Sequence, residues 1–385
     1  MTQPIYDALI IGGGLVGASA ALALHQQGKN VALLEVRPPI TDLPQLEQGW
    51  DARIFAISPA NRQFLQSLNA WADEKRIQAV TRMAVAGDSG GYIEFNAADL
   101  HTPHLTHIAE NRWLLAALWQ QIAAHAIPVF QQTAIALHTN IQQATLTLAD
   151  GSTLHSQLII GADGAHSWVR QQAGISVRED AYGHHGVVAN FHTELPHHNT
   201  AYQWFSHGEV LAYLPLPDHK ISIVWSTAQP EALTQLSPEA LAAAVSQRGH
   251  HVLGQLSPLS PAFAFNLILR RPASTVAQRI LLIGDAAHTI HPLAGQGVNL
   301  GFGDVIELAR LSQHASDLGA YQFLKRHAQN RLEPVRTMQL GCDGLFKLFQ
   351  CQTPPAMAWL RNSGLNIMNH LQPIKNQLIK HAMGL

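Results

Sequence analysis

The apolar residues near the start of the chain form short unbroken runs that alternate with glycine-rich turns. Residues 8–11 (Ala-Leu-Ile-Ile) form such a run, which is typical of a strand buried on both faces. A glycine cluster follows, and residues 18–27 then have the spacing of a helix that Gly28 ends. A second apolar run over residues 30–34 leads into Glu35. This order predicts a strand, a tight turn, a helix and a second strand followed by an acidic residue.

Two later apolar runs also end in a glycine-containing turn. Residues 158–160 lead into an Asp-Gly pair at 163–164, and residues 280–283 lead into a Gly-Asp pair at 284–285. Short apolar runs before turns indicate buried strands, and strands alternating with helices form parallel sheets. The pattern therefore predicts an α/β domain with a doubly covered, Rossmann-like sheet.

Between these two turns the pattern changes to short β-rich runs separated by turn residues. It predicts an antiparallel sheet inserted into the nucleotide-binding fold, followed by a helix over residues 234–247. The expected strands are residues 186–191, 201–205, 210–214 and 221–225. Four aromatic residues along these strands are expected mostly in the core, with one or two facing a substrate: Trp204, Phe205, Tyr213 and Trp225.

The chain from residue 321 onward has helical spacing of its apolar residues. Prolines are expected to break the helix at Pro334, at residues 354–355 and at Pro373. Apolar residues recur at helical spacing from Trp359 onward, with lysines nearby. Three interpretations stay open for this region: packing on its own domain, docking of a partner protein, or contact with a membrane surface.

Composition excludes several classes of protein. With 385 residues, of which 47% are apolar, the chain is long enough for two or three domains with a large core. A formal net charge of −2 gives no electrostatic footprint for nucleic acid. Two cysteines, Cys342 and Cys351, exclude a disulfide scaffold and a cysteine-based zinc site, and fit a reducing interior.

Residues 8–28 contain no Asp, Glu, Lys or Arg, a length that suggests a membrane span. The stretch follows Asp7 directly, has no basic segment before it and carries a glycine cluster in its middle. A span or signal peptide does not place glycines there. We therefore predict a buried strand, turn and helix.

Histidine is unusually frequent, with 23 residues against 24 Lys+Arg. Adjacent pairs at 184–185, 197–198 and 250–251 lie in polar stretches, and His288 and His291 flank a glycine-rich loop. None of these groups has the spacing and carboxylate partner of a metal site. We predict no metal and a charge that depends on pH.

Residues 12–17 (Gly-Gly-Gly-Leu-Val-Gly) match the pattern G-x-G-x-x-G between the first strand and helix. Gly12 permits the tight turn, Gly14 lets the backbone approach a pyrophosphate, and Gly17 allows helix and strand to pack closely. The helix N-terminus offers free N–H groups to phosphates. Glu35 is placed to accept hydrogen bonds from ribose hydroxyls. The motif predicts dinucleotide binding but does not separate NAD from FAD.

The turn after residue 283 continues into a glycine-rich loop over residues 292–297, and the spacing predicts a helix over 298–312. The loop brings amide groups to a helix N-terminus. A reduced flavin ring carries negative charge near N1 and the C2 carbonyl, which such a dipole stabilises. Asp285, at a strand end, can hold a ribityl or ribose hydroxyl. This arrangement favours FAD.

The segment after residue 160 has two interpretations. Asp163 and Gly164 can form a turn, Ser167 can cap the next helix, and Arg170 can pair with a phosphate or an acid. The alternative is a plain strand-to-helix connection, and the segment alone does not decide between them.

Together, the three glycine-containing motifs resemble those of FAD-dependent aromatic hydroxylases, the flavoprotein monooxygenases of the p-hydroxybenzoate hydroxylase type. Residues 51–58 (Asp-Ala-Arg-Ile-Phe-Ala-Ile-Ser) and 110–112 (Glu-Asn-Arg) look like the ubiquinone-biosynthesis hydroxylases. So do residues 360–365 and 380–384. The resemblance covers essentially the whole chain.

The resemblance implies roles for particular residues. Arg53 is expected near the flavin, although a surface ion pair is the alternative, and Arg112 is similar to a residue near the flavin in some relatives. The ADP half of FAD is expected at Gly12, Gly14, Gly17 and Glu35, the pyrophosphate and ribityl regions at Asp163, Gly284 and Asp285, and the isoalloxazine at Pro292, Gly295, Gln296, Gly297 and Asn299.

The resemblance also implies a domain division and a reaction. A discontinuous FAD-binding domain is expected over 1–80, 101–180 and 270–325, a substrate domain over 81–100 and 181–269, and a helical region over 326–385. NAD(P)H would reduce FAD, and O2 would form a flavin C4a-hydroperoxide that hydroxylates a polyprenylated phenol. A phenol-activating base is expected, but no residue is assigned to it. The alternatives are a hydroxylase of a soluble aromatic acid and a non-catalytic FAD-binding accessory protein.

The resemblance finally places the chain in the bacterial cytoplasm, with peripheral contact at the inner membrane. Other ubiquinone-biosynthesis proteins are expected as partners, and nucleic acid is not.

Overall fold

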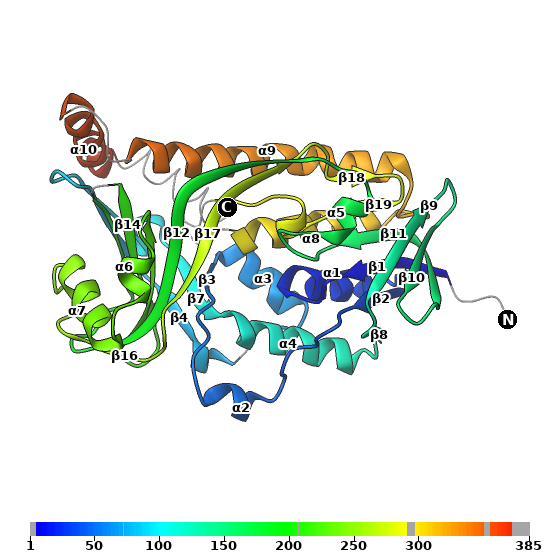
Figure 1. Cartoon of the computed structure of the whole chain (residues 1–385), viewed down its shortest axis with the longest axis horizontal. Helices are drawn as coiled ribbons and strands as arrows, with labels where there is room; N and C mark the ends of the chain where they lie inside the picture. Colours follow the sequence, from blue (N-terminus) through cyan, green and yellow to red (C-terminus); the bar gives the residue numbers. More distant parts are fainter. Residues whose placement is uncertain (1–4, 72, 207, 291–296, 350–354, 372–385) are drawn as a thin grey trace.

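The computed structural model describes residues 5–71, 73–206, 208–290, 297–349 and 355–371. Figure 1 shows an elongated molecule with one sheet and its helices at one end and a second sheet at the other. Helix α9 (Tyr321–Leu348) runs along both parts, and α10 (Pro355–His370) lies beyond its end. This mixed α/β architecture confirms the predicted fold class.

The first sheet has the strand order β18-β19-β11-β1-β2-β8, with β9 and β10 added beside β11. Its central pairs, from β19 through β11, β1 and β2 to β8, are all parallel. The strands are β1 (Ile5–Ile11), β2 (Val31–Leu34), β8 (Val129–Phe130), β9 (Ala134–Thr139), β10 (Ala144–Leu148), β11 (Thr153–Gly161), β18 (Val276–Ala277) and β19 (Ile280–Leu282).

Helices pack on one face of this sheet to form the largest core. The apolar side chains of β1 alternate between two clusters, with Ile10 in the core under the helices and Leu9 on the opposite face. Such burial on both faces explains the unbroken apolar runs. The helices of this core are α1 (Leu15–Gln26), α3 (Pro59–Ser67), α4 (Asn111–Ala124) and α8 (Gly297–Ser312).

Short elements connect these parts. They are α2 (Leu43–Glu47), α5 (Trp168–Gln172) and the 3-10 turns η1 (Glu74–Arg76), η2 (Ala97–Leu100) and η3 (Gly284–Ala286).

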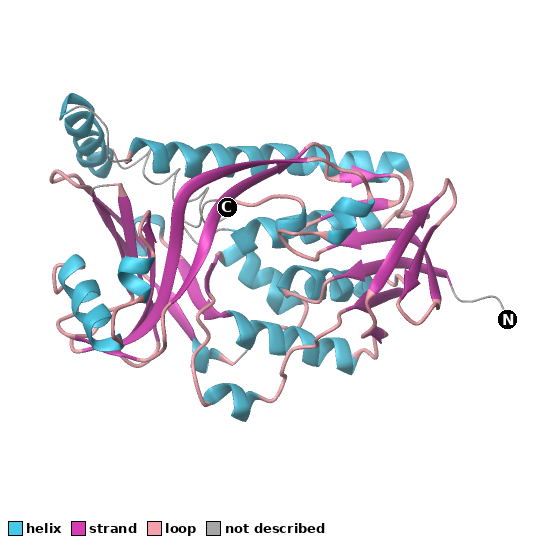
Figure 2. Ribbon diagram, viewed as in Figure 1, coloured by secondary structure: helices cyan, strands magenta, loops and turns pink. Residues whose placement is uncertain are grey.

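The second sheet has the order β16-β12-β15-β14-β13-β5-β6, and β17 also pairs with β12. Most pairs are antiparallel, whereas β13 and β5 are parallel. Figure 2 shows most strands of this sheet at one end of the molecule beside two short helices, whereas two long strands extend from there along the longest helix toward the first sheet. Its strands are β5 (Arg82–Ala86), β6 (Tyr92–Asn96), β12 (Val177–Thr193), β13 (Thr200–Ser206), β14 (Glu209–Leu216), β15 (Lys220–Thr227), β16 (Leu256–Pro258) and β17 (Phe263–Pro272).

The two faces of the second sheet have different covers. Helix α7 (Pro238–Arg248) and the end of α6 (Glu231–Thr234) pack on one face, where Trp204, Tyr213 and Trp225 are buried. Part of the other face packs on a small sheet of β3 (Ile54–Ile57), β4 (Ile77–Val80) and β7 (Thr106–Glu110). Another part of that face packs on the end of α9.

Helix α10 covers the edge strand β6 through a row of asparagines. Asn362 Oδ1 accepts hydrogen bonds from the Ser89 and Gly91 amides, at 3.2 and 3.0 Å. Asn366 and Asn369 accept from the amides of Tyr92 and Glu94, at 2.8 and 3.0 Å. Successive turns of α10 thus supply side-chain acceptors for the outward-facing amides of β6 and of the turn before it.

Several element boundaries differ from the sequence predictions, and three of the differences concern helices. Helix α9 continues through Pro334, so the predicted break there is wrong. A proline removes one backbone hydrogen bond, and here the packing of Leu324, Cys342 and Phe346 on either side outweighs that loss. The predicted helix over 234–247 is divided into α6 and α7, because Ser237 accepts from the Ala240 amide and caps a new helix. The first helix begins earlier than predicted, at Leu15.

The extents of the domains stay a proposal. The pairing of β5 and β13, which joins residues 82–86 to the second sheet, supports assigning residues 81–100 to the substrate domain. Within the described residues, no helix has the length and hydropathy needed to cross a membrane.

Candidate functional site

The turn between β1 and α1 accepts only glycine at two of its motif positions. Gly12 has φ +103°, and a Cβ there would lie 2.5 Å from the carbonyl oxygen of Ala162. A Cβ on Gly17 would lie 1.9 Å from the Gly12 carbonyl oxygen. Both positions therefore serve the close approach of α1, β1 and the end of β11.

Gly14 differs from these two, because nothing lies within 4 Å of a Cβ built on it. It precedes α1 with φ −68°. Its hydrogen is thus not required by protein packing, and the space beside it is open at the N-terminus of a helix. This space is what a pyrophosphate needs in order to reach the backbone N–H groups.

Glu35 follows β2 and binds the same turn. Its Oε2 accepts from the Gly13 amide at 2.7 Å, and its Oε1 accepts from the Arg37 amide at 3.0 Å. Since each carboxylate oxygen accepts more than one hydrogen bond, the half-buried side chain keeps acceptor capacity for a ribose. The structure therefore adds a positioning role to the predicted binding role.

Trp119 is a contributor that sequence reasoning missed. Its Nε1 donates to the Gly13 carbonyl at 2.8 Å, and a Cβ on Gly13 would lie 2.6 Å from its ring. Trp119 comes from α4, more than 100 residues along the chain, so no local pattern reveals this contact.

In the second motif, at residues 163–164, the aspartate is hydrogen-bonded to neighbouring residues of the chain. Asp163 accepts from the Ser167 hydroxyl at 2.5 Å and from the Val169 amide at 3.1 Å, which caps α5. Ser167 caps the same helix, as predicted, by accepting from the Arg170 amide at 3.0 Å. A pyrophosphate contact of Asp163 stays a prediction, and its carboxylate has a structural role.

Arg170 links the second and third motifs. Its guanidinium is buried and donates to the carbonyls of Ala286 and Ala165, at 3.0 and 2.9 Å. Its donors to described residues therefore reach backbone oxygens, no ion pair with a described acid includes it, and a phosphate contact stays a prediction. These two hydrogen bonds hold the 163–167 turn next to the 284–286 turn.

Asp285 is the accessible carboxylate of the third motif. Its side chain is accessible to solvent. Many protein atoms nevertheless surround the carboxylate, and the resulting desolvation raises its pKa. The charges of His288, Arg53 and Arg270 act in the opposite direction and lower that pKa. An accessible carboxylate surrounded by protein fits a ligand that is rich in hydroxyl groups.

Val16 holds the third motif against the first. Gly284 has φ +59°, and a Cβ on it would lie 3.2 Å from the Val16 side chain. A Cβ on Gly301 would lie 2.5 Å from that same side chain. Glycines in η3 and α8 therefore allow α1 to pack closely on both.

Asp304 is a buried carboxylate in α8 that binds the third motif. Its side chain accepts from the Gly284 amide at 3.0 Å and contacts Arg331 Nε at 2.7 Å. Burial would raise the pKa of Asp304, but the charges of His288 and Arg331 outweigh burial and hold that pKa well below its usual range. His327 Nε2 also lies 2.9 Å from the Asp304 carbonyl oxygen.

Arg53 lies where the small sheet meets the second sheet. The segment before it is held by Asn190 of β12, whose Nδ2 donates to the Asp51 carbonyl at 3.0 Å. The Arg53 side chain is exposed, and the ion pairs between described residues do not include it. Its charge acts on Asp285, which supports the flavin-proximal prediction over a surface ion pair.

Arg112 binds protein groups through its Nε and Nη2 atoms. It pairs with Glu110 and donates to the carbonyls of Leu46, at 2.9 Å, and Gly49. A direct contact with flavin stays a prediction. The observed role of Arg112 is to hold the segment that leads to Arg53.

Glu110 is the centre of that arrangement and is fully buried. It accepts from Arg76 at 3.1 Å and from the Asp51 amide at 3.0 Å. Burial raises the pKa of Glu110, while the positive charges of Arg112 and Arg76 oppose the rise. Arg76 also stacks on the Trp50 ring at 4.1 Å.

The expected isoalloxazine segment is described only in part. Pro292, Gly295 and Gln296 lie outside the described residues. Gly297 begins α8, and nothing lies within 4 Å of a Cβ built on it. Asn299 is buried, and its side chain binds the Ala56 carbonyl at 2.7 Å and the Ser58 amide at 3.1 Å.

The four aromatic residues of the second sheet that were expected mostly in the core, with one or two facing a substrate, are all buried. Trp204, Tyr213 and Trp225 face α7, and Phe205 stacks on Phe349, the residue that follows α9. None of the four is more than 9% exposed.

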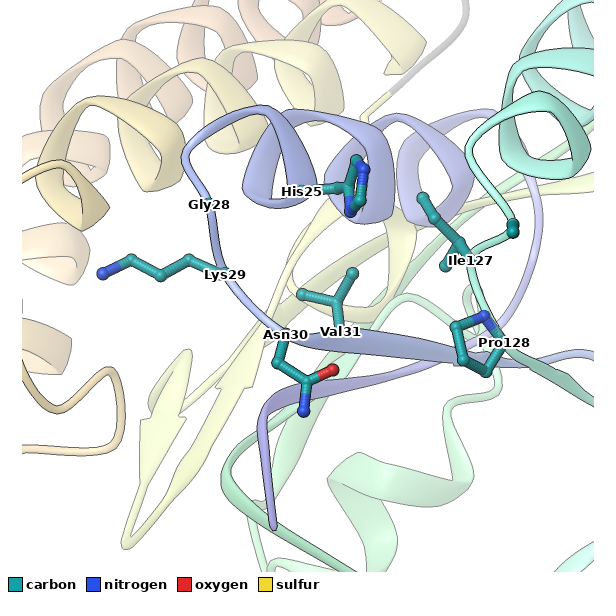
Figure 3. Close-up of a pocket in the computed structure, with 8 residues that line it drawn as sticks. His25, Gly28, Lys29, Asn30, Val31, Ile127 and Pro128 are labelled. Carbon is teal, nitrogen blue, oxygen red and sulfur yellow. The ribbon is translucent and has the colours of Figure 1, made fainter. Parts of the chain in front are cut away.

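A cavity of about 310 Å³ lies at the other end of α1 (Figure 3). It is lined by residues 25, 28–31 and 126–128, and Lys29 extends from it to the Ala315 carbonyl. This cavity lies at the C-terminal end of α1 and is therefore separate from the nucleotide turn at residues 12–17. Helix C-termini carry partial negative charge and repel phosphates, so the cavity does not suit the pyrophosphate.

The residues at the first end of α1 fit FAD. Gly14 directly precedes α1 and Gly297 is the first residue of α8, and the space beside each of these glycines is open. Glu35 and Asp285 supply acceptors for hydroxyl groups. The arrangement thus offers donors for a pyrophosphate and acceptors for sugar-like groups in one α/β domain.

Comparison with known proteins agrees with this chemistry. Residues 5–338 match the family model described as an FAD binding domain. The chain is 35% identical to 3-demethoxyubiquinol 3-hydroxylase of Escherichia coli over 100% of both chains. The chain belongs to this family of FAD-dependent monooxygenases. The family resemblance identified from the sequence is confirmed.

Other members have similar extents. The chain is 32% identical to ubiquinone hydroxylase UbiL of Rhodospirillum rubrum, covering 99% of this chain and 90% of that protein. It is 33% identical to the human ubiquinone biosynthesis monooxygenase COQ6, covering 99% and 93%. Among solved structures, Klebsiella pneumoniae HpxO complexed with FAD and uric acid has a TM-score of 0.76 at 18% identity, covering 97% and 96%. That similarity shows a shared fold.

Proposed function

We propose that this protein hydroxylates the aromatic ring of a polyprenylated phenol in ubiquinone biosynthesis, using NAD(P)H and O2. The observation that carries the proposal is full-length similarity to a 3-demethoxyubiquinol 3-hydroxylase. The similarity to a bacterial ubiquinone hydroxylase and to mitochondrial ubiquinone biosynthesis monooxygenases supports it further. Because these relatives come from both bacteria and mitochondria, we base the proposal on the reaction type that their names share.

The nucleotide part of FAD would be held by the first motif. The turn at Gly12 and the space at Gly14 direct amide groups of α1 toward the pyrophosphate, with Gly17 keeping the helix close. Glu35 would bind the ribose. Asp163 would serve the pyrophosphate region through the α5 turn that it holds.

The rest of the cofactor would lie along the third motif. Asp285 would bind ribityl hydroxyls, and Gly284 gives its turn the required positive φ. The N-terminus of α8, at Gly297, would place a positive dipole near the ring. Bound FAD supplies electron transfer from NAD(P)H and the activation of O2 for oxygenation of the phenol.

The protein around the ring would orient the phenol and exclude water. Arg53 adds positive charge beside Asp285 and would favour an electron-rich, partly ionised phenol. The loop that carries Pro292, Gly295 and Gln296, together with the backbone at Asn299, would complete the ring site. Arg112 acts on this site through the segment before Arg53.

We also propose that the protein works in the bacterial cytoplasm, in peripheral contact with the inner membrane and with other ubiquinone-biosynthesis proteins. The support is a set of exposed leucines and an isoleucine on the two C-terminal helices: Leu340, Leu345, Leu348 and Ile367. A substrate with a prenyl tail resides in lipid. An apolar surface on the enzyme would bind the membrane and bring the site close to that substrate.

The test is to load the purified protein with FAD and measure NAD(P)H oxidation and product formation. An octyl-substituted phenol and 4-hydroxybenzoate are compared as substrates. Stimulation by the octyl phenol with formation of a hydroxylated product is expected. Stimulation by 4-hydroxybenzoate alone would replace this function with that of a soluble-acid hydroxylase. FAD binding without stimulation by either phenol would indicate an accessory protein.

A further inference from the structure

Three buried N–H groups in one side-chain cluster have no acceptor among the described residues. They are Nε of Arg62 on α3, Nε1 of Trp71, which precedes η1, and Nδ1 of His107 on β7. The whole His107 residue is only 3% exposed. A buried donor without an acceptor destabilises a fold, and folded proteins rarely leave several of them in one place. This cluster therefore calls for an acceptor.

The three side chains contact one another. Arg62 Nη1 lies 2.8 Å from His107 Nε2, and Arg62 Cζ lies 5.3 Å from the centre of the Trp71 ring. The Trp71 and His107 rings meet edge to face, with 5.6 Å between their centres. The three donors thus belong to one compact cluster, although they come from a helix, a turn and a strand.

The tautomer of His107 makes the third group a donor. A guanidinium has no lone pair to offer, so Arg62 donates to His107 Nε2, and the hydrogen of the neutral ring is on Nδ1. Burial, with the nearby His104 and Arg62, lowers the pKa of His107 to about 3, so the ring is neutral at pH 7. Arginine Nε and tryptophan Nε1 are also donors only. The cluster has donors to spare and lacks an acceptor.

The local charge favours an anion over a water molecule as that acceptor. The positive charge of Arg62 acts directly on His107 and helps to lower its pKa. Glu74 pairs with Arg62 Nη2 at 3.0 Å, but its side chain is 69% exposed, so solvent screens its negative charge. A water molecule would bring two hydrogens that need acceptors of their own. A halide ion accepts from several donors and brings none.

We propose that Arg62, Trp71 and His107 bind a small inorganic anion such as chloride. The three N–H groups are its ligands, and the guanidinium supplies the opposite charge. This site is separate from the FAD site and does not depend on the proposed function. It is nevertheless linked to the flavin helix, because Asn61, the residue before Arg62, donates to the Asn299 side chain of α8 at 2.8 Å. An anion in the cluster fixes α3, and through α3 it supports α8.

The test compares the thermal midpoint of the FAD-loaded protein in sodium chloride and in sodium gluconate at equal ionic strength, since gluconate is too large for a buried cluster. A ligand that binds only the folded chain raises this midpoint, so chloride at about tenfold above its Kd should add about 2 °C. Trp71→Phe keeps a ring and removes one donor, and this variant should lose the chloride increment. Trp50→Phe is the matched control and should keep it, because Trp50 is also a half-buried ring that contacts an arginine, with Arg76 Cζ 4.1 Å from its centre.

Crystals grown in sodium bromide give a second measurement, which decides the matter even if Trp71→Phe fails to fold. An anomalous bromide peak within hydrogen-bonding distance of Trp71 Nε1 and His107 Nδ1 is expected. A water molecule at that place would overturn the anion site. Equal wild-type midpoints in the two salts, or a chloride increment that Trp71→Phe retains, would overturn it as well.

Discussion

His288 Nε2 lies 2.8 Å from Oδ2 of Asp304, the same oxygen that accepts the Gly284 amide. One buried carboxylate of α8 thus holds the start and the end of the turn that presents Asp285. Since Arg331 of α9 pairs with the other oxygen, the long C-terminal helix is coupled to the same turn. Disturbing this carboxylate should disturb a site it does not line.

Asp304→Asn is expected to weaken FAD binding by tenfold or more. The amide keeps the shape but removes the charge that His288 and Arg331 face, and uncompensated buried charges cost about 3–5 kcal/mol. FAD affinity is measured by quenching of flavin fluorescence. Glu307→Gln, which loses a pair with exposed Arg310 on the same helix, is the control. Equal FAD affinities for the Asp304 variant and wild type would contradict the coupling.

Gly14→Ala and Gly17→Ala should have different consequences. A methyl group at Gly14 enters open space, so the unliganded protein should keep its thermal midpoint while FAD affinity falls by at least tenfold. A methyl group at Gly17 would meet the Gly12 carbonyl, so the fold itself should be destabilised. Thermal unfolding without added FAD, followed by FAD titration, separates the two effects. A Gly14→Ala protein that binds FAD normally would show that no ligand approaches this backbone.

Glu110→Gln should destabilise the protein and weaken the FAD site together. The substitution leaves Arg76 and Arg112 beside a neutral group in a buried place, with an expected cost of about 3–5 kcal/mol in the free energy of unfolding. The segment through Asp51 loses its anchor, so Arg53 loses its position. Denaturant unfolding and FAD titration measure both effects. The pair of Lys220 with the exposed Asp218 provides a control, Asp218→Asn, which is expected to cost less than about 1 kcal/mol.

Stability should fall as the pH drops below about 6.5, because several histidines are held neutral. Burial, with the nearby His104 and Arg62, lowers the pKa of His107 to about 3. Between these two values the unfolded chain binds a proton that the folded chain does not, so stability rises with pH across this window. Burial also lowers the pKa of His104, His184, His197 and His327.

Calorimetric unfolding at pH 7 and pH 5 tests this expectation. His107→Gln should reduce the difference between the two pH values by up to about 1.4 kcal/mol per pH unit, the limit for one proton. His138→Gln, on β9 with no such burial, should leave the difference unchanged. A wild-type protein with equal stability at both pH values would refute the interpretation.

The sequence predicted the parallel core well because its signals are local. The apolar runs, the glycine turn at residues 12–17 and Glu35 all lie within one βαβ unit, and their geometry depends on near neighbours. The helical continuity through Pro334 was missed because the packing of distant residues outweighs one lost hydrogen bond. Local propensity cannot anticipate that balance.

The candidate site was predicted where a motif binds a ligand directly and was missed where residues act through others. Trp119 and Asp304 reach the site from helices further along the chain, and no spacing connects them to the glycine turns. Glu110 was noted only as part of a family signature, which does not reveal its burial or its contacts with Arg76 and the Asp51 amide. The sequence allowed Arg170 a phosphate or an acid as partner, because a charge suggests a charged partner. In the fold, its guanidinium donates to two carbonyl oxygens from separate turns, a contact that no local pattern indicates.

The asparagines of α10 have a consequence for solubility and assembly. An edge strand with free amides can pair with the edge of another molecule, and proteins protect such edges. In this chain the protection comes from side-chain oxygens on a helix, so the sheet ends without offering a template for further strands. A chain cut before Asn362 would expose β6 and should self-associate through it, which links the integrity of the C-terminal helix to the protein remaining dispersed in solution.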